Sequence, residues 1–334
     1  MLEIRRHQEV TDVLCDTAAE FIEVLNPLSG PYLQSSTLPA YIFRGVSSSE
    51  HQLLPSAYRP DAHLLDGPTW VQAPLLTIGD QCRAEVDTLQ RFVGIASRHG
   101  IRLPEDSQVL RTQLESWHSR LADASAEKPL TWPTPEFLSI IALAQHYRVP
   151  TRALDWTWSP LVAAYFAARD SMGTQEGQIA VWVFNYLAKF VDRIFEVIFP
   201  SERPLRLFTA PGADNQNLRA QRGLFMLEVH VITDAKAPFV ARPYDHLLPD
   251  SFPGAKDLCK VTRVLLPAIH AASVIRYLSA ADITGGSLFP GLWGVARELD
   301  EERILSRTRS PFALTQFGWD LQARITSADE TSGT

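Results

Sequence analysis

One segment limits the fold more than any other part of the chain. Residues 137–168 are almost wholly apolar, as expected of a core, and yet they hold several polar and charged side chains. These are Gln145, His146, Arg148, Arg152, Asp155 and Thr157. Because burying a charge without a partner is expensive, the charged members need either ion-pair partners or a ligand.

Two interpretations of these groups stay open. Arg152 and Asp155 are three residues apart, and an ion pair between them could brace the connection between two buried helices. His146 ends the first helix, where the helix dipole favours a protonated imidazole. In the other interpretation, these groups line a ligand pocket, and Trp156 or Trp158 offers a flat wall to a ring of the ligand. The density of complementary polar groups favours the pocket.

A second candidate site follows the β-favouring run "AYIFRGV", residues 40–46. An arginine at the end of a buried strand places its guanidinium at a cleft, and the planar fork of Arg44 suits phosphate or carboxylate. Gly45 would let the backbone approach a ligand closely. The alternative is that Arg44 pairs with an internal carboxylate such as Glu85 on the next helix.

The predicted elements indicate an α+β fold, in which a helical N-terminal part surrounds a mixed or antiparallel sheet. Apolar spacing predicts helices up to residue 25 and over 80–98, 106–124 (capped by Asp106), 136–146 and 269–278, a helix from Pro160 capped by Ser159, and a last one near 288. Besides 40–46, strands are expected at 178–185 and within 196–200, 204–210, 224–232 and 259–267. No regular βαβ alternation is visible.

Composition narrows the classes of function. The net charge of -7 argues against general binding of nucleic-acid phosphates, and the three cysteines form no CxxC pair. The start of the chain lacks the apolar core of a signal peptide, and no run reaches the roughly 18 apolar residues of a membrane span. We therefore expect a cytoplasmic protein without membrane contact. The usual nucleotide, hydrolase and zinc-protease motifs are absent, and no metal site is predicted.

Several of these stretches together resemble the FRG domain family, named for the Phe-Arg-Gly motif that Phe43, Arg44 and Gly45 form here. The resemblance covers "YIFRGVSSSEHQLLPSAYR", Glu85 at the start of an amphipathic helix, "ALAQHYRVPTRALDWTWSPLVAAYFAA", "NLRAQRGLFMLEV" and the stretch 261–299. It implies an N-terminal helical extension over 1–40, an FRG domain over 41–305 and a partly flexible tail over 306–334.

A more distant resemblance is to ADP-ribosyltransferases of the arginine–serine–glutamate type, and it implies their fold. It gives Arg44 the role of holding the phosphates of NAD, and it places Asp155, Trp156 and Thr157 at the Ser-Thr-Ser motif. The third motif corresponds to "AQRGLFMLEV", where Gly223 stands in place of the catalytic glutamate and Gln221 and Glu228 are the neighbouring candidates.

The resemblance thus implies an NAD-dependent ADP-ribosyltransferase-like protein, with NAD as substrate and a protein or nucleic acid as acceptor. The implied NAD-binding residues are Arg44, Gly45, Tyr147, Arg152, Trp156 and Thr157. The implied catalytic residues are His146, Asp155, Gln221 and Glu228. A bacterial toxin or phage-defence setting, with an antitoxin or defence-system partner, fits such chemistry. The alternatives are a non-catalytic module that binds a nucleotide or partner in the same pocket, and a hydrolase or nuclease.

Overall fold

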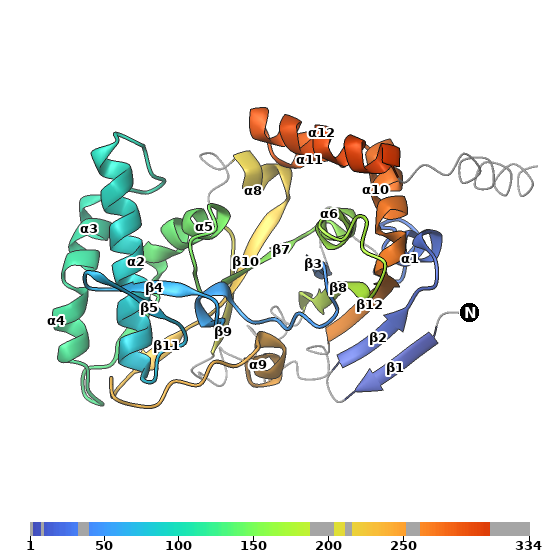
Figure 1. The fold of residues 1–334 in the computed structure, drawn as a ribbon. Helices are drawn as coiled ribbons and strands as arrows, with labels where there is room; N and C mark the ends of the chain where they lie inside the picture. The colour runs from blue at the N-terminus through green and yellow to red at the C-terminus, as the bar shows by residue number, and fades with distance from the viewer. Residues whose placement is uncertain are drawn as a thin grey trace, which may run out of the picture.

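A computed structural model describes residues 3–7, 10–32, 40–187, 204–210, 216–251 and 261–307. Within these residues the chain forms an α+β fold with one large mixed sheet and two small two-stranded sheets (Figure 1). The strands of the large sheet lie in the order β1 (Glu3–His7), β2 (Val10–Leu14), β12 (Val261–Pro267), β8 (Gln178–Asn185), β3 (Tyr41–Val46), β7 (Ala153–Thr157), β10 (Gly223–Glu228) and β9 (Leu205–Phe208).

The large sheet consists of two halves that meet at a single residue pair. On one side, β3 pairs with β8 along its whole length, from Tyr41 to Val46. On the other side, β7 pairs with β10 from Ala153 to Thr157. Between the halves, β3 and β7 are paired only at Phe43 and Thr157, and the strands then separate. Figure 1 shows β7 and β10 running away from β3, β8 and β12.

Three helices cover one face of the half-sheet that contains β3: α1 (Ala18–Val24), α6 (Pro160–Arg169) and α10 (Ala271–Ala280) (Figure 1). Ser159 caps α6 by accepting from the N–H of Val162, and Pro160 occupies its first turn, as the sequence predicts. The helix α6 follows β7 directly and packs on β3. The short α11 (Gly285–Leu288) and the long α12 (Leu292–Arg307) close this end of the fold.

A helical lobe packs on the other half-sheet. It contains α2 (Ile78–Arg98), α3 (Gln108–Glu115), α4 (Trp117–Ala122), η2 (Pro135–Phe137) and α5 (Leu138–His146), which bury one apolar cluster with β6 (Leu130–Trp132), β7 and β10. The opposite face of the sheet is covered by η1 (Ser56–Tyr58), β4 (His63–Asp66) and α9 (Tyr244–Ser251). The remaining elements are β5 (Thr69–Gln72), α8 (Gln216–Ala220), β11 (His230–Ile232) and η4 (Ala268–His270).

The structure corrects four of the predicted elements. The helix expected up to residue 25 is wrong for the residues that form β1 and β2. The strand β2 pairs in parallel with β12, and the helix begins only at Ala18. The helix expected over 106–124 divides at Ser116, and Ser107 rather than Asp106 caps its first part. The connection between α5 and α6 contains the strand β7. The strand expected over 224–232 divides at Val229 into β10 and β11.

Other predictions are confirmed, and some lie beyond the described residues. Helices α2, α5, α6 and α10 and strands β3 and β8 are confirmed. The predicted strand at 196–200 and most of the tail after 306 lie outside the described residues. No helix in the described ranges is both long and apolar enough to cross a membrane.

Candidate functional site

The side chain of Arg44 lies where the two half-sheets separate. Its Nη1 donates a hydrogen bond of 2.7 Å to the backbone carbonyl of Asp155 on β7, and the same nitrogen is 3.9 Å from the carboxylate Oδ2 of Asp155. The Arg44 Nε is buried and has no hydrogen-bond partner in the described part of the chain. The guanidinium therefore spans the gap between β3 and β7 with only part of its hydrogen-bonding capacity used.

The electrostatic surroundings of Arg44 favour an anion. Burial lowers the pKa of Arg44, the carboxylate of Asp155 raises it, and the nearby positive charge of Arg59 lowers it again, with a net pKa below the usual value. Arg59 itself is exposed, and its Nε donates to the carbonyl of Leu54 at 3.1 Å. Two guanidinium groups thus act on a site that holds one carboxylate, and an incoming anion would restore the balance of charge.

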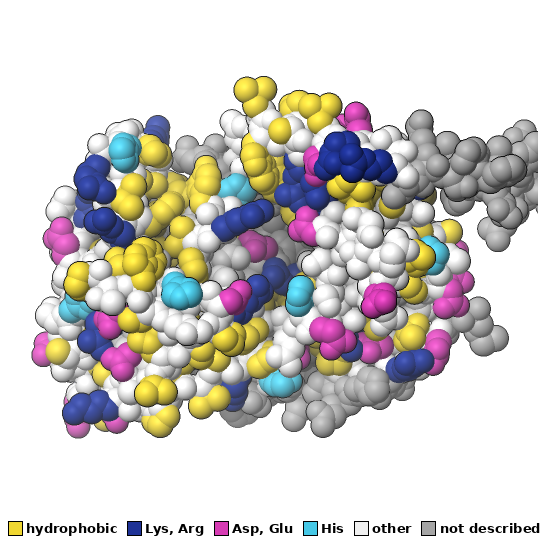
Figure 2. Space-filling model, in the orientation of Figure 1, with side chains coloured by type: hydrophobic (Ala, Val, Ile, Leu, Met, Phe, Trp, Pro, Cys, Tyr) yellow, Lys and Arg dark blue, Asp and Glu magenta, His cyan; other side chains and the backbone are white. Residues whose placement is uncertain are grey.

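The Asp155 carboxylate is held in place by a hydrogen-bonded chain. Gln145 Nε2 donates to Asp155 Oδ2 at 2.8 Å, and Gln145 Oε1 accepts from the hydroxyl of Thr151 at 2.7 Å and from that of Ser56 at 3.4 Å. The side chain of Asp155 is nevertheless 54% exposed. Its position is fixed while one side remains open to solvent. Figure 2 shows a hollow near the centre of this face, and both basic and acidic side chains are visible in it.

His146 lies next to this network, at the end of α5. The Nδ2 of Asn217 is 2.7 Å from the imidazole Nε2, and because an amide nitrogen only donates, the ring accepts with Nε2 and carries its proton on Nδ1. Burial lowers the pKa of His146 and the charge of Asp155 opposes this, leaving the pKa below its usual value. At neutral pH the imidazole is therefore uncharged.

Thr157 and Gln221 connect the strands at the base of the gap. The Thr157 hydroxyl donates to the carbonyl of Gln221 at 2.7 Å and accepts from the N–H of Ser159 at 3.0 Å. The side chain of Gln221 donates to the carbonyl of Leu288 at 3.2 Å. Both predicted site residues thus bond to backbone groups of the scaffold.

Three of the predicted site residues are buried away from the open network. Arg152 is 1% exposed, and its Nε and Nη2 form a bidentate pair with Glu85 at 2.6 and 3.1 Å. Trp156 is 2% exposed and belongs to the core on the opposite face from Asp155. Glu228 is 5% exposed and lies 3.4 Å from His230. Burial raises the pKa of Glu228, but the neighbouring His230, together with the charge of Arg152, holds it below the usual value.

The predicted ion pairs are consequently exchanged. Arg152 does not pair with Asp155, and Glu85 pairs with Arg152 instead of Arg44. The reason is the strand β7. The spacing of apolar residues in this segment did not predict a strand there. Successive residues of a strand point to opposite faces, so Arg152, directly before β7, and Asp155, three residues later, lie on different sides.

Gly45 serves the packing of α6 rather than the approach of a ligand. A Cβ at this position would clash with the carbonyl oxygen of Ala163 and with the backbone nitrogen of Ala167 on α6. Only glycine allows the helix to lie this close to β3. The Gly of the Phe-Arg-Gly sequence therefore sets the distance between α6 and the strand that carries Arg44.

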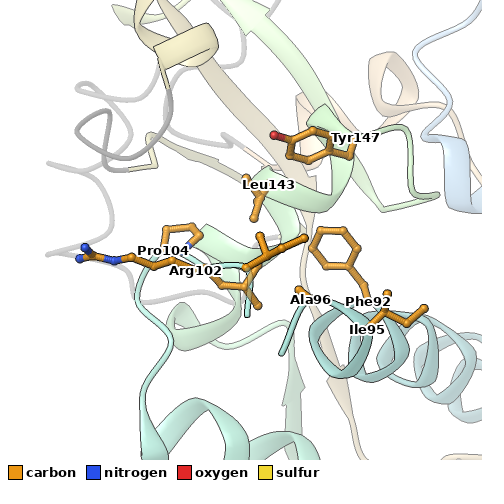
Figure 3. A pocket seen from close by; sticks show the side chains of 9 residues that line it. Phe92, Ile95, Ala96, Arg102, Pro104, Leu143 and Tyr147 are labelled. Carbon is orange, nitrogen blue, oxygen red and sulfur yellow. The ribbon is translucent and has the colours of Figure 1, made fainter. Parts of the chain in front are cut away.

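Tyr147 follows His146 and lies at an apolar pocket of about 540 Å3 between α2 and α5. It is 64% exposed, and its ring contacts that of His146 with 5.2 Å between centroids. Figure 3 shows Tyr147 and Leu143 on one side of this pocket, with Phe92 and Ile95 of α2 on the other. A planar ring could stack on Tyr147, one residue beyond the polar network.

The site also contains residues that the sequence did not single out. These are Ser56 on η1, Arg59 directly after η1, and Thr151 in the turn before β7. Ser56 and Thr151 are 95 residues apart in the sequence, and the N–H of Thr151 donates to the Ser56 hydroxyl. Ser56 and Arg59 lie in "LPSAYR", where no spacing distinguishes them from an ordinary turn. Gln145 was one of the polar residues noted in the apolar segment, and its hydrogen bond to Asp155 shows that it positions that carboxylate. In the described residues, no group of three or more His, Cys, Asp or Glu could hold a metal ion.

Comparison with known families finds one match. Residues 39–176 match the FRG domain, and this range includes Arg44, Glu85, Gln145, His146, Arg152 and Asp155. No curated protein and no solved structure matches the chain. The match coincides with β3, the helical lobe, β7 and α6, which together build the site. The chain carries an FRG domain, and the open Arg44–Asp155 site lies within it.

Proposed function

We propose that this protein binds a nucleotide at the gap between β3 and β7, with the phosphates of NAD on Arg44. The observation that carries the proposal is the incompletely bonded guanidinium of Arg44 beside an exposed, fixed carboxylate. A phosphate oxygen near Arg44 would form charge-assisted hydrogen bonds. The second guanidinium, that of Arg59, adds attraction for the same charge.

The neighbouring groups suit the uncharged parts of such a ligand. The Asp155 carboxylate accepts hydrogen bonds from ribose hydroxyls, and the Gln145 amide donates hydrogen bonds to them. The imidazole of His146 is uncharged, so it neither attracts nor repels the charged groups of the ligand. Tyr147 offers a stacking surface for a base or for nicotinamide. Arg152, Trp156 and Glu228 take no direct part in this proposal, because they are enclosed by protein.

A second candidate function is ADP-ribosyl transfer from NAD, and the exposed carboxylate of Asp155 favours it. Cleavage of the nicotinamide–ribose bond develops positive charge on the ribose, and a carboxylate fixed nearby stabilises that charge. In this proposal Asp155 takes the part that Glu228 cannot take, since Glu228 is buried against His230. Gln221 supports the strands without touching the substrate.

The acceptor of such a transfer would be a protein side chain or a nucleic acid. The cytoplasm supplies NAD, and a toxin or phage-defence effector with an antitoxin or defence-system partner is the setting that the resemblance supports. The chain has a net charge of -7, and the site itself holds the carboxylate of Asp155. Both negative charges repel nucleic-acid phosphates, which favours a protein acceptor.

The binding proposal is tested by titrating NAD and ADP-ribose into wild type and Arg44→Ala by calorimetry. Loss of charge-assisted hydrogen bonds weakens binding by about 1.5–3 kcal/mol, roughly 10- to 150-fold. Arg98→Ala, which removes an exposed arginine at the end of α2, is the matched control and should bind like wild type. Equal affinity of the Arg44 and Arg98 variants would overturn the proposal.

The transfer proposal has a separate readout. Nicotinamide release from NAD is followed by chromatography for wild type, Asp155→Asn and Arg44→Ala. Transfer predicts release that Asp155→Asn abolishes while NAD binding persists. Binding without release in the wild type leaves nucleotide binding as the function and contradicts the transfer.

A further inference from the structure

A second cavity, polar and of about 460 Å3, lies on the β1, β2 and β12 side of the large sheet. It is lined by β1, β2, β12, β8, the loop after β3 and the start of α9, and it is partly open to solvent. Its lining carries mostly hydrogen-bonding side chains and no apolar platform comparable to the pocket at Tyr147. The polar lining residues include Asp12, Ser49, Gln178, Trp182, Asp245 and Arg263. It shares no lining residue with the Tyr147 pocket or the Arg44 site.

One wall of this cavity is already saturated. Arg263 on β12 forms a bidentate pair with Asp12 on β2, with both distances at 2.7 Å, and donates to the carbonyl of Ser49 at 3.2 Å. Its guanidinium also lies over the ring of Trp182, 5.3 Å from the centroid. Each nitrogen of the Arg263 guanidinium therefore donates a hydrogen bond, and Asp12 balances its charge. This wall offers no free cation to an anionic ligand.

Two atoms of the lining lack partners. The indole Nε1 of Trp182 and the carboxylate Oδ1 of Asp245 are both buried, and neither has a hydrogen-bond partner in the described part of the chain. Trp182 is 3% exposed and Asp245 is 8% exposed. The other oxygen of Asp245 lies 3.6 Å from His246. A buried donor and a buried acceptor without partners are costly, and both belong to side chains that line one cavity.

The chemistry of these two atoms selects the ligand. The indole N–H needs an acceptor, and the carboxylate oxygen needs a donor. A cation would satisfy only Asp245, and an anion would satisfy only Trp182. A hydroxyl group both donates and accepts, so a ligand with neighbouring hydroxyls satisfies the two together. The amides of Gln52 and Gln178 and the hydroxyl of Ser49 add further groups of the same dual character.

We propose that this cavity binds a polyhydroxylated ligand, either a free sugar or the ribose of a nucleoside, through Asp245 and Trp182. The site is independent of the proposed nucleotide site. Trp182 is nevertheless the residue that pairs with Arg44 across β8 and β3, about 5 Å away along the sheet. The two sites therefore flank the same strand pair on β3 and β8.

The proposal is tested by titrating D-ribose, D-glucose and adenosine into protein labelled with 15N and following the indole N–H resonances. The resonance of Trp182, assigned with Trp182→Phe, should move on saturation, because its N–H gains an acceptor. If D-ribose and adenosine shift the Trp182 resonance and D-glucose does not, the ligand is a nucleoside. If all three shift it, the cavity is a general sugar site. Arginine amide and inorganic phosphate are the charged probes and should leave the Trp182 resonance in place.

The role of Asp245 is tested with two substitutions. Asp245→Ala removes the acceptor and should weaken binding of the sugar that binds best about tenfold or more, while Asp245→Asn keeps an acceptor and should retain an intermediate affinity. Glu302→Gln on α12 and Trp70→Phe on β5, both exposed, are the matched controls and should bind like wild type. Thermal unfolding checks that each variant is folded.

The outcomes separate this proposal from the nucleotide proposal. Arg44→Ala should leave sugar binding unchanged, and Asp245→Ala should leave phosphate-dependent binding of ADP-ribose unchanged. Failure of all three hydroxylated probes to shift Trp182 at millimolar concentration overturns the sugar site alone. A shift by arginine amide or by phosphate that equals the shift by D-ribose overturns it as well.

Discussion

Two arginine–carboxylate arrangements border β7, and they differ in every property that decides the role of an ion pair. Arg152 and Glu85 are buried, bidentate and surrounded by further acceptors, including the carbonyl of Glu228 at 3.1 Å. Arg44 and Asp155 are 3.9 Å apart, and Asp155 is 54% exposed. The first arrangement is complete without a ligand, whereas the second leaves hydrogen-bonding capacity unused. Completeness of bonding, rather than the presence of an arginine, distinguishes scaffold from site.

The largest expected effect concerns the buried pair. Arg152→Met removes the partner of Glu85 and leaves a carboxylate in the core, so the free energy of unfolding should fall by about 3–5 kcal/mol. Urea denaturation followed by circular dichroism measures this. The double variant Arg152→Met with Glu85→Gln removes the stranded charge and should recover part of the loss. A single variant as stable as wild type would show that the pair does not support the core.

The next effect tests the strand that carries the open pair. Gly45→Ala pushes a methyl group into the backbone of α6 at Ala163 and should lower the free energy of unfolding by about 1–3 kcal/mol. Gly94→Ala on the exposed side of α2, where an added Cβ meets nothing within 4 Å, is the control and should leave stability unchanged or slightly raised. Equal stability of the two variants would contradict the close packing of α6 on β3.

Arg44→Ala should lower the free energy of unfolding by only about 1 kcal/mol, because it removes one hydrogen bond to a backbone carbonyl and a long ion pair whose carboxylate is half exposed. A double-mutant cycle between Arg44 and Asp155, measured by urea denaturation, should give a coupling well below that between Arg152 and Glu85. Couplings of equal size would remove the distinction between the two arrangements. Under the proposed function the same variant should lose nucleotide affinity, so that stability and binding would separate at this residue.

The smallest effect is a dependence of stability on pH at His146. Its folded-state pKa lies below the unfolded value of about 6.5, so the unfolded chain takes up the proton first and stability is lost as pH falls below about 6.5. The neutral variant His146→Asn should lose less stability between pH 7.5 and 5.5 than wild type. Thermal unfolding at both values measures the difference, and an identical loss in the two proteins would show that His146 does not contribute.

Part of this site could be predicted from the sequence. The strand ending at Arg44–Gly45 and the cap of α6 at Ser159–Pro160 have local signals, and both are confirmed. The density of polar groups around Asp155 also pointed to a pocket wall. These features depend on neighbouring residues, which a single sequence records directly.

The rest depended on contacts between distant residues. Glu85 and Arg152 are 67 residues apart, and nothing in their own segments shows that they meet. The five residues of β7 were interpreted as a connection between two buried helices, so the faces of Arg152 and Asp155 could not be assigned. The pairing of β2 with β12 likewise turns a segment of helical spacing into a strand.

The single junction between the half-sheets gives a ligand a mechanical role. Apart from the pair of Phe43 and Thr157, the hydrogen bond from Arg44 to Asp155 is the next connection between β3 and β7 along the gap. A ligand that contacts both side chains would therefore add a further connection between β3 and β7. Because it binds the folded state alone, its presence at 100 times the dissociation constant should stabilise the protein by about 2.7 kcal/mol.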